Sequence, residues 1–189
     1  MSAAALAECA CAEIAAAVGA IDEAGALELV DAIAAAKRIV LYGVGREGLM
    51  MRALAMRLYH LGLDAHVVGD MSAPPVGPGD LLLVSAGPGD FSTVAALVGV
   101  ARGAGAHTAS VTAQPGGAVP QAADTVFVIP AQTMADDTPG DGAGGTSVLP
   151  MGSLYEGAQF VAFEVLVLLL RGRLGLSPDA MRARHTNLE

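Results

Sequence analysis

The stretch at residues 39–48 reads IVLYGVGREG, a short apolar run that ends at the first of three closely spaced glycines. A run of β-branched residues and Leu bounded by Gly is typical of a buried strand. Residues 48–61, which follow, carry apolar side chains at helical spacing. The stretch therefore predicts a strand, a tight turn and a helix in that order, which is the repeating unit of an α/β fold.

The same alternation continues toward the C-terminal third of the chain. Further short runs rich in β-branched residues or Leu lie at 65–68, 81–85, 108–111 and 125–129. Helical patterns lie between them at 92–105 and, over a shorter stretch, at 118–123. Strands that alternate with helices favour a parallel sheet covered by helices on both faces. The unbroken apolar run at 81–84 is typical of a strand buried on both sides.

Helical patterns also flank this alternating region. Residues 2–36 carry two helical segments with a break near residues 19–22, and residues 151–174 form one long helical pattern. Ser177 followed by Pro178 predicts a last short helix, because Ser is a favoured cap and Pro fits the first helical position. Residues 130–150 are rich in Gly, Thr and Asp without apolar periodicity, which predicts a long loop, mobile and partly disordered.

The composition predicts one acidic domain that associates with copies of itself. The chain has 189 residues, of which 53% are hydrophobic and 15% are charged, against a usual charged share of about 25%. This length suits a single globular domain over residues 1–189. The excess of apolar side chains predicts burial against other subunits, in a homo-oligomer such as a dimer or tetramer. The net charge of −9 opposes binding to nucleic acid and to anionic membranes.

Cysteine usage and the placement of charges bear on the compartment. Cys9 and Cys11 are two residues apart in a helical segment, where such positions do not face each other, so we expect neither a disulfide nor a metal site. The first basic residue is Lys37, so no secretory leader or transit peptide is predicted and a cytoplasmic location is expected. The apolar run at 160–170 contains Glu164 and falls short of the roughly 20 apolar residues of a membrane span, so it predicts a buried core helix.

Two glycine-rich loops directly follow predicted strands, where ligands bind in parallel sheets. The loop GVGREG at 43–48 has the spacing of a dinucleotide-binding fingerprint. The acidic residue that would hold a ribose is missing, since Asp70 lies too far along, so a nicotinamide-dependent enzyme is disfavoured. The alternative interpretation of these glycines is a tight strand-to-helix turn. The second loop, SAGPGDFST at 85–93, leads into a predicted helix whose first amides can receive an anion.

With these two loops side by side, the chain resembles the sugar isomerase (SIS) domain family, and within it the 6-phospho-3-hexuloisomerases. The segments that carry the resemblance are GVGREG at 43–48, AMRLYHLG at 55–62, LPMGSLYE at 149–156 and MRARHTNLE at 181–189. The resemblance implies a three-layer α-β-α sandwich of the doubly wound, flavodoxin-like kind, with a five-stranded parallel sheet and an N-terminal helical extension. It also implies a homotetramer built from dimers, with a phosphosugar pocket shared across subunits.

Members of this family interconvert a 3-hexulose 6-phosphate and fructose 6-phosphate by moving a proton through an enediol, without a metal or an organic cofactor. Such chemistry needs a base, a proton shuttle and groups that hold negative charge. The resemblance implies that Glu156 is the base, and that His60 and Arg46 serve as proton shuttle and as ligand of the oxyanion or phosphate. It further implies that His185 enters the site of a neighbouring subunit.

Each of these four residues also has a structural interpretation. Glu156 lies near the start of a helix, where a carboxylate favours the helix dipole, and Arg46 in a glycine loop suits an interface salt bridge. His60 is equally consistent with a hydrogen-bonded structural histidine, and His185 with packing of the C-terminal tail.

The two loops also supply the residues expected to bind substrate. They are Gly43, Gly45, Glu47, Ser85, Gly87, Gly89, Asp90, Ser92 and Thr93. The family holds phosphate mainly with loop hydroxyls, and here Glu47, Ala86, Pro88 and Phe91 stand where those hydroxyls are expected. A hydrogen bond to a charged group contributes roughly 1.5–3 kcal/mol, so their loss weakens a phosphate site. Glu47 repels a phosphate unless it is paired with Arg46 or protonated.

The leading hypothesis is an aldose–ketose or ketose–ketose isomerase of the SIS type that acts on a sugar phosphate or a related sugar derivative, with Glu156 as base. The missing loop hydroxyls keep two alternatives open. One is a non-catalytic SIS module that binds a sugar derivative, and the other is an isomerase of a different, unphosphorylated carbohydrate. In each case the expected partner is a small-molecule sugar.

Overall fold

Five parallel strands form the single sheet of the described chain, in the order β2-β1-β3-β4-β5. The computed structural model describes residues 1–137 and 146–188. The strands are β1 (Ile39–Gly43), β2 (Ala65–Val67), β3 (Leu81–Ser85), β4 (His107–Thr112) and β5 (Thr125–Val128). They coincide with the five predicted runs to within a residue at each end. The order is that of the doubly wound, flavodoxin-like sheet, so the predicted fold class is confirmed.

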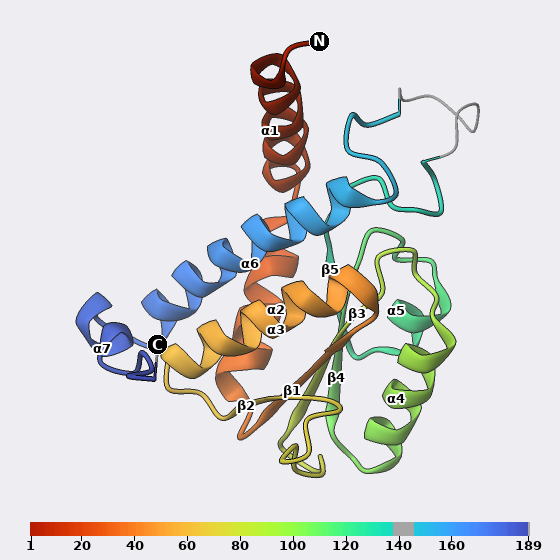
Figure 1. The fold of residues 1–189 in the computed structure, drawn as a ribbon. Coiled ribbons are helices and arrows are strands. Elements are labelled where there is room, and N and C mark those ends of the chain that lie inside the picture. The colour runs from red at the N-terminus through yellow and green to blue at the C-terminus, as the bar shows by residue number, and fades with distance from the viewer. Residues whose placement is uncertain (138–145, 189) are drawn as a thin grey trace.

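Helices cover both faces of this sheet (Figure 1). One face carries α2 (Glu23–Ala35), α3 (Gly45–His60) and α6 (Ser153–Arg173), and the other carries α4 (Ser92–Gly103) and α5 (Ala118–Ala122). Side chains alternate along the strands between the two sides. Leu41 and Leu83 belong to the core beneath α2, α3 and α6, whereas Leu82 and Val84 belong to the core beneath α4 and α5. The result is the three-layer sandwich that the alternating pattern predicts.

The terminal helices lie outside these three layers. The helix α1 (Ala3–Gly19) projects from the body of the molecule and meets α6, and its axis turns by 77° into α2 (Figure 1). At the other end, α7 (Pro178–Arg182) begins at the predicted cap, where the Ser177 side chain accepts a hydrogen bond from the Ala180 amide at 3.1 Å. The predicted N-terminal extension and last short helix are therefore confirmed.

The long helix α6 is the core helix expected from its apolar pattern. It has 21 residues and contains an 18-residue stretch with a mean hydropathy of 1.5, so it is long and apolar enough to cross a bilayer, and the bent pair α1 and α2 passes the same criterion. Phe163, Leu166 and Leu170 of α6 are nevertheless buried in the core against α2 and α3. Glu164 forms an ion pair with Arg57 of α3 at 3.1 Å. These contacts identify α6 as a packed helix of the domain.

The predicted loop at 130–150 is described at both ends, and its central residues 138–145, for which mobility is predicted, lie outside the described residues. On the near side, the Thr133 amide donates to Asp136 Oδ1 at 2.6 Å within the loop, and Gln114 Nε2, from the segment after β4, donates to Asp136 Oδ2 at 3.4 Å. On the far side, the Val148 amide donates to Glu13 of α1 at 3.2 Å, and Ser147 also hydrogen-bonds Glu13. The described ends of the loop are thus fastened to the domain.

The strand order places a crevice at the carboxyl ends of β1 and β3. The chain leaves β1 through α3 toward β2 on one side, and leaves β3 through α4 toward β4 on the other. Connections that diverge from two adjacent parallel strands leave a gap between them, where ligands bind in such folds. Both glycine-rich loops open into this gap.

Candidate active site

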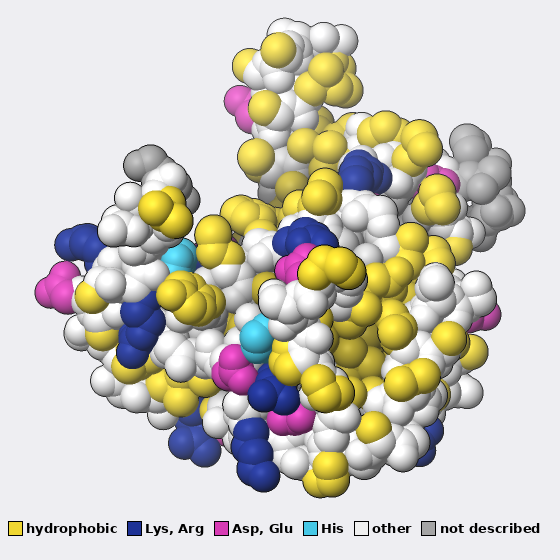
Figure 2. Space-filling view, turned by 60° about the horizontal axis from the view of Figure 1, so that its bottom comes forward, with side chains coloured by type: hydrophobic (Ala, Val, Ile, Leu, Met, Phe, Trp, Pro, Cys, Tyr) yellow, Lys and Arg dark blue, Asp and Glu magenta, His cyan; other side chains and the backbone are white. Residues whose placement is uncertain are grey.

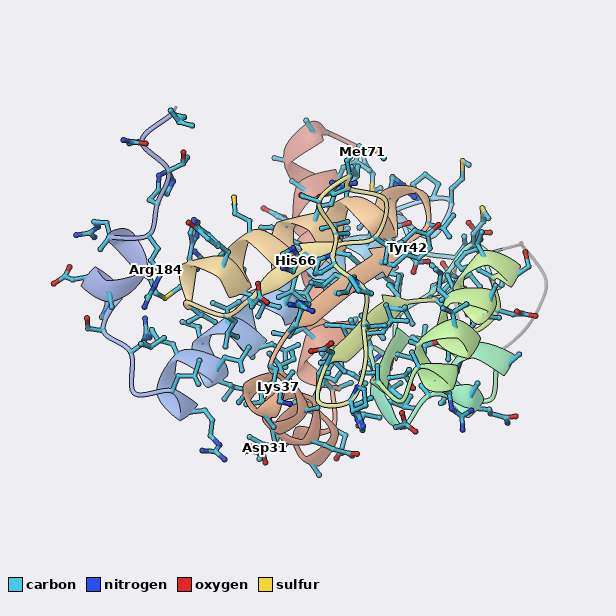
Figure 3. The ribbon with its side chains drawn as sticks, turned by 90° about the horizontal axis from the view of Figure 1, so that it is seen from below. Asp31, Lys37, Tyr42, His66, Met71 and Arg184 are labelled. Carbon is cyan, nitrogen blue, oxygen red and sulfur yellow. The ribbon has the colours of Figure 1, made fainter. Side chains whose placement is uncertain are left out.

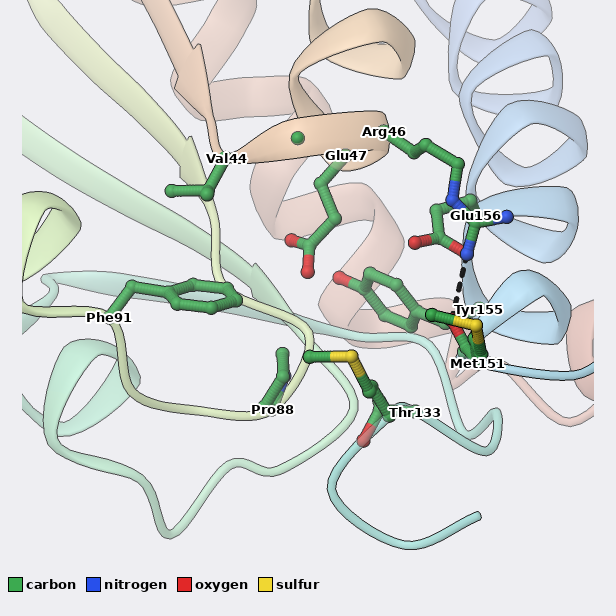
Figure 4. Close-up of a pocket in the computed structure, with 12 residues that line it drawn as sticks. Val44, Arg46, Glu47, Pro88, Phe91, Thr133, Met151, Tyr155 and Glu156 are labelled. Carbon is green, nitrogen blue, oxygen red and sulfur yellow. Dashed lines mark hydrogen bonds and ion pairs between the residues drawn. The ribbon is translucent and has the colours of Figure 1, made fainter.

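A cavity of about 320 Å³ lies at this switch point, which is within the size range of small-molecule sites. It is formed by the loops after β1 and β3, the start of α6 and the near end of the 130–150 loop (Figure 4). Its lining residues are Val44, Gly45, Arg46, Glu47, Pro88, Phe91, Thr133, Met134, Met151, Gly152, Tyr155 and Glu156.

Arg46 and Glu156 meet at one side of the cavity. Arg46 Nη2 lies 3.1 Å from Glu156 Oε2, and the guanidinium also donates to Ser153 Oγ and to the Met151 carbonyl, both at 2.7 Å. This ion pair joins the first turn of α3 to the first turn of α6, although the two residues are far apart in sequence. The guanidinium is therefore held in place by three contacts with the start of α6.

Glu156 has the properties of a general base. Burial raises the pKa of its carboxyl group, and the Arg46 charge opposes that rise. Oε2 is buried, and the contact with Arg46 lacks hydrogen-bond geometry, so this oxygen accepts no hydrogen bond from the described residues. A carboxylate oxygen that is withdrawn from water, and whose pKa is moved toward neutrality, is suited to accept a proton from a bound ligand.

Glu47 lies deeper, with 5% of its surface exposed. Its carboxylate accepts hydrogen bonds from Ser85 Oγ at 2.5 Å and from the Gly87 amide at 3.0 and 3.2 Å. Burial raises the pKa of Glu47, the hydrogen bonds from Ser85 and Gly87 oppose the rise, and the Glu156 charge adds to it. Glu47 is therefore held by donors of the second loop, whereas Arg46 pairs with Glu156.

A buried polar network surrounds the Ser85 hydroxyl that donates to Glu47. Ser85 Oγ receives a hydrogen bond from Gln159 Nε2 at 2.8 Å and lies 3.3 Å from the Tyr155 hydroxyl. Burial and the neighbouring Glu47 charge raise the pKa of Tyr155 well above 10.0, so the phenol stays neutral. Figure 4 shows the Glu47 carboxyl group pointing toward the Tyr155 hydroxyl, with Phe91 on the other side.

Tyr155 and Gln159 were not among the predicted site residues. They are four residues apart on α6, so both side chains lie on the face that covers Ser85. The available signal was a Gln within an otherwise apolar stretch of a predicted core helix, because a buried polar side chain needs a partner.

The predicted substrate-binding residues fall into three groups. Gly45 and Glu47 line the cavity, while Ser85 and Gly87 lie directly behind it and hold Glu47. Gly43 and Gly89 shape the two turns by close backbone contacts with Gly48 and Gly117. Asp90, Ser92 and Thr93 are exposed around the start of α4 and are not among the lining residues.

His60 and His185 come together at the opposite end of α3. Their rings stack with centroids 5.5 Å apart, and Arg184 donates to the His60 carbonyl at 3.3 Å. Figure 3 shows Arg184 beside the C-terminal end of that helix. At 1.5 Å per residue, this end of α3 is about 21 Å from Arg46 along the helix axis. Within one chain the two histidines are thus remote from Arg46 and Glu156, and their predicted catalytic roles remain predictions that need a second copy of the chain.

The described residues hold no cluster of three or more His, Cys, Asp or Glu side chains suited to a metal ion. Cys9 and Cys11 are exposed and form no disulfide.

The buried carboxyl group of Glu47 predicts a specific pH dependence of stability. Because its pKa is raised above 4.5, the folded chain binds more protons than the unfolded chain between the two pKa values. The contribution of this group to stability is therefore complete below about pH 4.5 and is lost as the pH rises through the folded pKa. In Glu47→Gln, we expect the Tm relative to wild type to increase over the same interval. Thermal melts of both proteins from about pH 4 to about pH 8 check this, and a difference independent of pH would contradict it.

Known proteins resemble this chain over most of its length. A family model described as SIS domain matches residues 32–156. A 3-hexulose-6-phosphate isomerase of Mycobacterium gastri is 36% identical over 152 residues, which cover 80% of this chain and 74% of the relative. A protein of the same name from Bacillus subtilis (strain 168) is 31% identical over 164 residues, or 86% of this chain and 85% of the relative.

A solved structure from Methanococcus jannaschii shows the same fold. It is described as a hypothetical protein with an inferred molecular function of 3-hexulose-6-phosphate isomerase. It matches with a TM-score of 0.81 at 26% identity, over 96% of this chain and 98% of that one. Together with the family model, these likenesses confirm the predicted resemblance: the chain belongs to the SIS domain family.

Proposed function

We propose that this chain is a sugar isomerase that moves a carbonyl group between neighbouring carbons of a ketose. Its relatives named 3-hexulose-6-phosphate isomerase supply the reaction class. The observation that carries the proposal is the buried Oε2 of Glu156, which lines the cavity beside the Arg46 guanidinium and accepts no hydrogen bond from the described residues.

The proposed reaction of a 3-ketose needs two proton transfers at carbon. The Glu156 carboxylate removes the proton from C2, the electron pair forms the C2=C3 double bond, and the C3 oxygen gains a proton to give the enediol. The C2 hydroxyl then loses its proton as C2=O forms, and Glu156 returns a proton to C3. The positive charge of Arg46 stabilises negative charge that develops on the substrate oxygens. Atoms and electrons balance within the substrate, so the reaction consumes no other reactant.

A second candidate function is a non-catalytic module that binds a sugar derivative. The observation that favours it is the Glu47 carboxylate, which already occupies the Ser85 hydroxyl and the Gly87 amide. In that case the cavity binds a sugar without proton exchange.

The deciding experiment is incubation of the full chain with fructose and fructose 6-phosphate in D₂O, followed by proton NMR. An isomerase exchanges the hydrogen on the carbon next to the carbonyl group for deuterium and forms an isomeric ketose. Binding of either sugar, detected by thermal shift, without deuterium exchange would favour the binding module.

We also propose that the chain forms a homo-oligomer through α6 and α1. Five large apolar side chains on one face of α6 are between 37% and 55% exposed: Phe160, Val161, Val165, Leu168 and Leu169. Figure 2 shows hydrophobic side chains gathered on the projecting α1 and on the adjoining surface. An apolar helical face of this extent is typical of a surface covered by another subunit.

A charge on this face is expected to break the assembly. Leu168→Asp places a carboxylate where Leu168 is 55% exposed, so it costs little in an isolated chain but must be desolvated in an interface. Light scattering after size exclusion is expected to show a lower molar mass for this variant than for wild type. The matched control is Val100→Asp on α4, where Val100 is 68% exposed on the opposite side of the sheet. Equal masses for all three proteins would contradict the assignment of the interface to α6.

A further inference from the structure

The Glu47 carboxylate occupies the hydrogen-bond donors that the second loop directs toward the cavity. It comes from the first turn of α3, yet it accepts from the hydroxyl of Ser85, the last residue of β3, at 2.5 Å and from the amide of Gly87, in the loop that follows, at 3.0 Å. Loop amides and hydroxyls at this edge of a parallel sheet are the usual donors to a bound anion. Here the anion that they hold is a side chain of the protein.

The space around these donors is also filled. A Cβ atom added at Gly87 would lie 2.7 Å from the Tyr155 ring and 2.9 Å from Glu47 Oε1. A contact under 3.0 Å requires atoms to move, so even a methyl group does not fit between the loop, the ring and the carboxylate. A phosphate group can reach the Ser85 and Gly87 donors only if Glu47 leaves them.

The charges of the cavity oppose a phosphate as well. Among the lining residues that the structure describes, Arg46 is the single cation, against the carboxyl groups of Glu47 and Glu156. Arg46 is already engaged by Glu156, Ser153 and the Met151 carbonyl. A phosphate dianion placed beside Glu47 would meet a buried carboxylate with no compensating cation directed at it, which is costly in a site withdrawn from water.

A hydroxyl group of a ligand, unlike a phosphate, is compatible with the position beside Glu47. A carboxylate offers about four acceptor positions. Ser85 and Gly87 use those that face the second loop, and Glu47 also lines the cavity, so acceptor capacity remains for a hydroxyl donor on a ligand.

We infer that Glu47 is a specificity-determining residue, which makes this site select a sugar that presents a hydroxyl group, rather than a phosphate, to the loop after β3. The inference rests on the proposed function for the statement that the ligand is a sugar. It rests on the contacts of Glu47 for the exclusion of phosphate.

The test compares thermal stabilisation of the full chain by inorganic phosphate, D-fructose and D-fructose 6-phosphate. Three proteins are compared: wild type, Glu47→Ser and Glu8→Ser. The Glu47→Ser change removes the buried carboxylate, frees the Ser85 and Gly87 donors and adds a hydroxyl group. The Glu8→Ser control removes the same charge from an exposed position on α1.

We expect phosphate to leave the Tm of wild type and of Glu8→Ser unchanged and to raise the Tm of Glu47→Ser by several degrees. Fructose 6-phosphate is expected to stabilise Glu47→Ser more than it stabilises wild type. If Glu47→Ser does not fold, Glu47→Gln removes the charge with a side chain of the same size, and phosphate is expected to stabilise it more than wild type.

Two results would overturn the inference. One is stabilisation of wild type by phosphate or fructose 6-phosphate to the same extent as the Glu47 variants. The other is a folded Glu47 variant that phosphate does not stabilise. Neither readout requires turnover. Deuterium exchange on fructose 6-phosphate by wild type, with binding tighter than that of fructose, would uphold the proposed function and overturn this inference. Absence of exchange on every sugar that binds, together with stabilisation by phosphate of the Glu47 variants alone, would overturn the proposed function and uphold this inference.

Discussion

Glutamine in place of Glu156 is expected to lower isomerase turnover by about 10²–10⁴-fold and to abolish deuterium exchange at the substrate carbon, because a general base contributes a factor of this size. Gln has the shape of Glu but does not accept a proton at neutral pH. Glu156 is partly buried with a raised pKa, so its replacement by a neutral amide is not expected to destabilise the fold. Binding of the sugar, measured by calorimetry, is expected to stay close to that of wild type.

The matched control is Glu164→Gln on the same helix. Glu164 also pairs with an arginine of α3, Arg57, at 3.1 Å, and it is not among the residues that line the cavity. Both variants remove an ion pair between α3 and α6, so an activity difference between them reports on the role of Glu156 in the cavity and not on the loss of an ion pair as such. Full turnover in Glu156→Gln would remove Glu156 from the role of base and leave the binding module as the better proposal.

The position of this site follows from features that a sequence displays directly. Apolar runs alternating with helical patterns predict the parallel sheet, and the two glycine loops predict the edge of the sheet at which a ligand binds. Arg46 and Glu47 lie in the first of these loops, so their place in the cavity follows from the fold class. The contact between Arg46 and Glu156 depends on how α6 crosses α3, and the resemblance to the family was needed to bring those two residues together.

The hydrogen-bond partners of Glu47 could not be predicted from the sequence. Glu47 follows Arg46 in the sequence, and pairing between these two was one way to offset its charge. In the structure Arg46 turns toward α6, while Glu47 turns inward to Ser85 and Gly87. Adjacent residues at the start of a helix point about 100° apart, so which of them faces the cavity and which faces the core is decided by packing of distant segments.

For the loop residues Asp90, Ser92 and Thr93, the sequence predicts the position in the fold but not the direction of the side chains. The spacing after β3 places them at the start of a helix, which is correct, and the first residue of α4 is Ser92. All three are nevertheless exposed, because the turn carries Pro88 and Phe91 into the cavity instead. A motif fixes the approximate place of a loop, whereas the direction of each side chain depends on the turn geometry.

The glycine at position 48 provides the second large effect expected from a single substitution. An added Cβ would lie 2.5 Å from the Gly43 carbonyl oxygen, so α3 passes directly over the end of β1. Alanine is the better helix former by about 1 kcal/mol, and without this contact Gly48→Ala would stabilise α3. With it, the backbone of the first turn must shift, and overpacking of this kind costs about 1–3 kcal/mol.

Gly99→Ala in α4 is the matched control, since no heavy atom lies within 4 Å of the added Cβ there. We expect Gly99→Ala to keep or raise the Tm, and Gly48→Ala to lower it by several degrees, at about 2–4 °C per kcal/mol for a domain of this size. Calorimetric scans of both variants measure the difference in Tm. Equal Tm values would show that the contact between β1 and α3 accommodates the added methyl group without loss of stability. The shift of α3 also displaces Arg46 and Glu47, so turnover is expected to fall in Gly48→Ala and not in Gly99→Ala. Such a result would show that the third glycine of the GVGREG loop is required because α3 approaches β1 closely. Dinucleotide-binding loops have the same requirement, but the requirement itself does not depend on a dinucleotide.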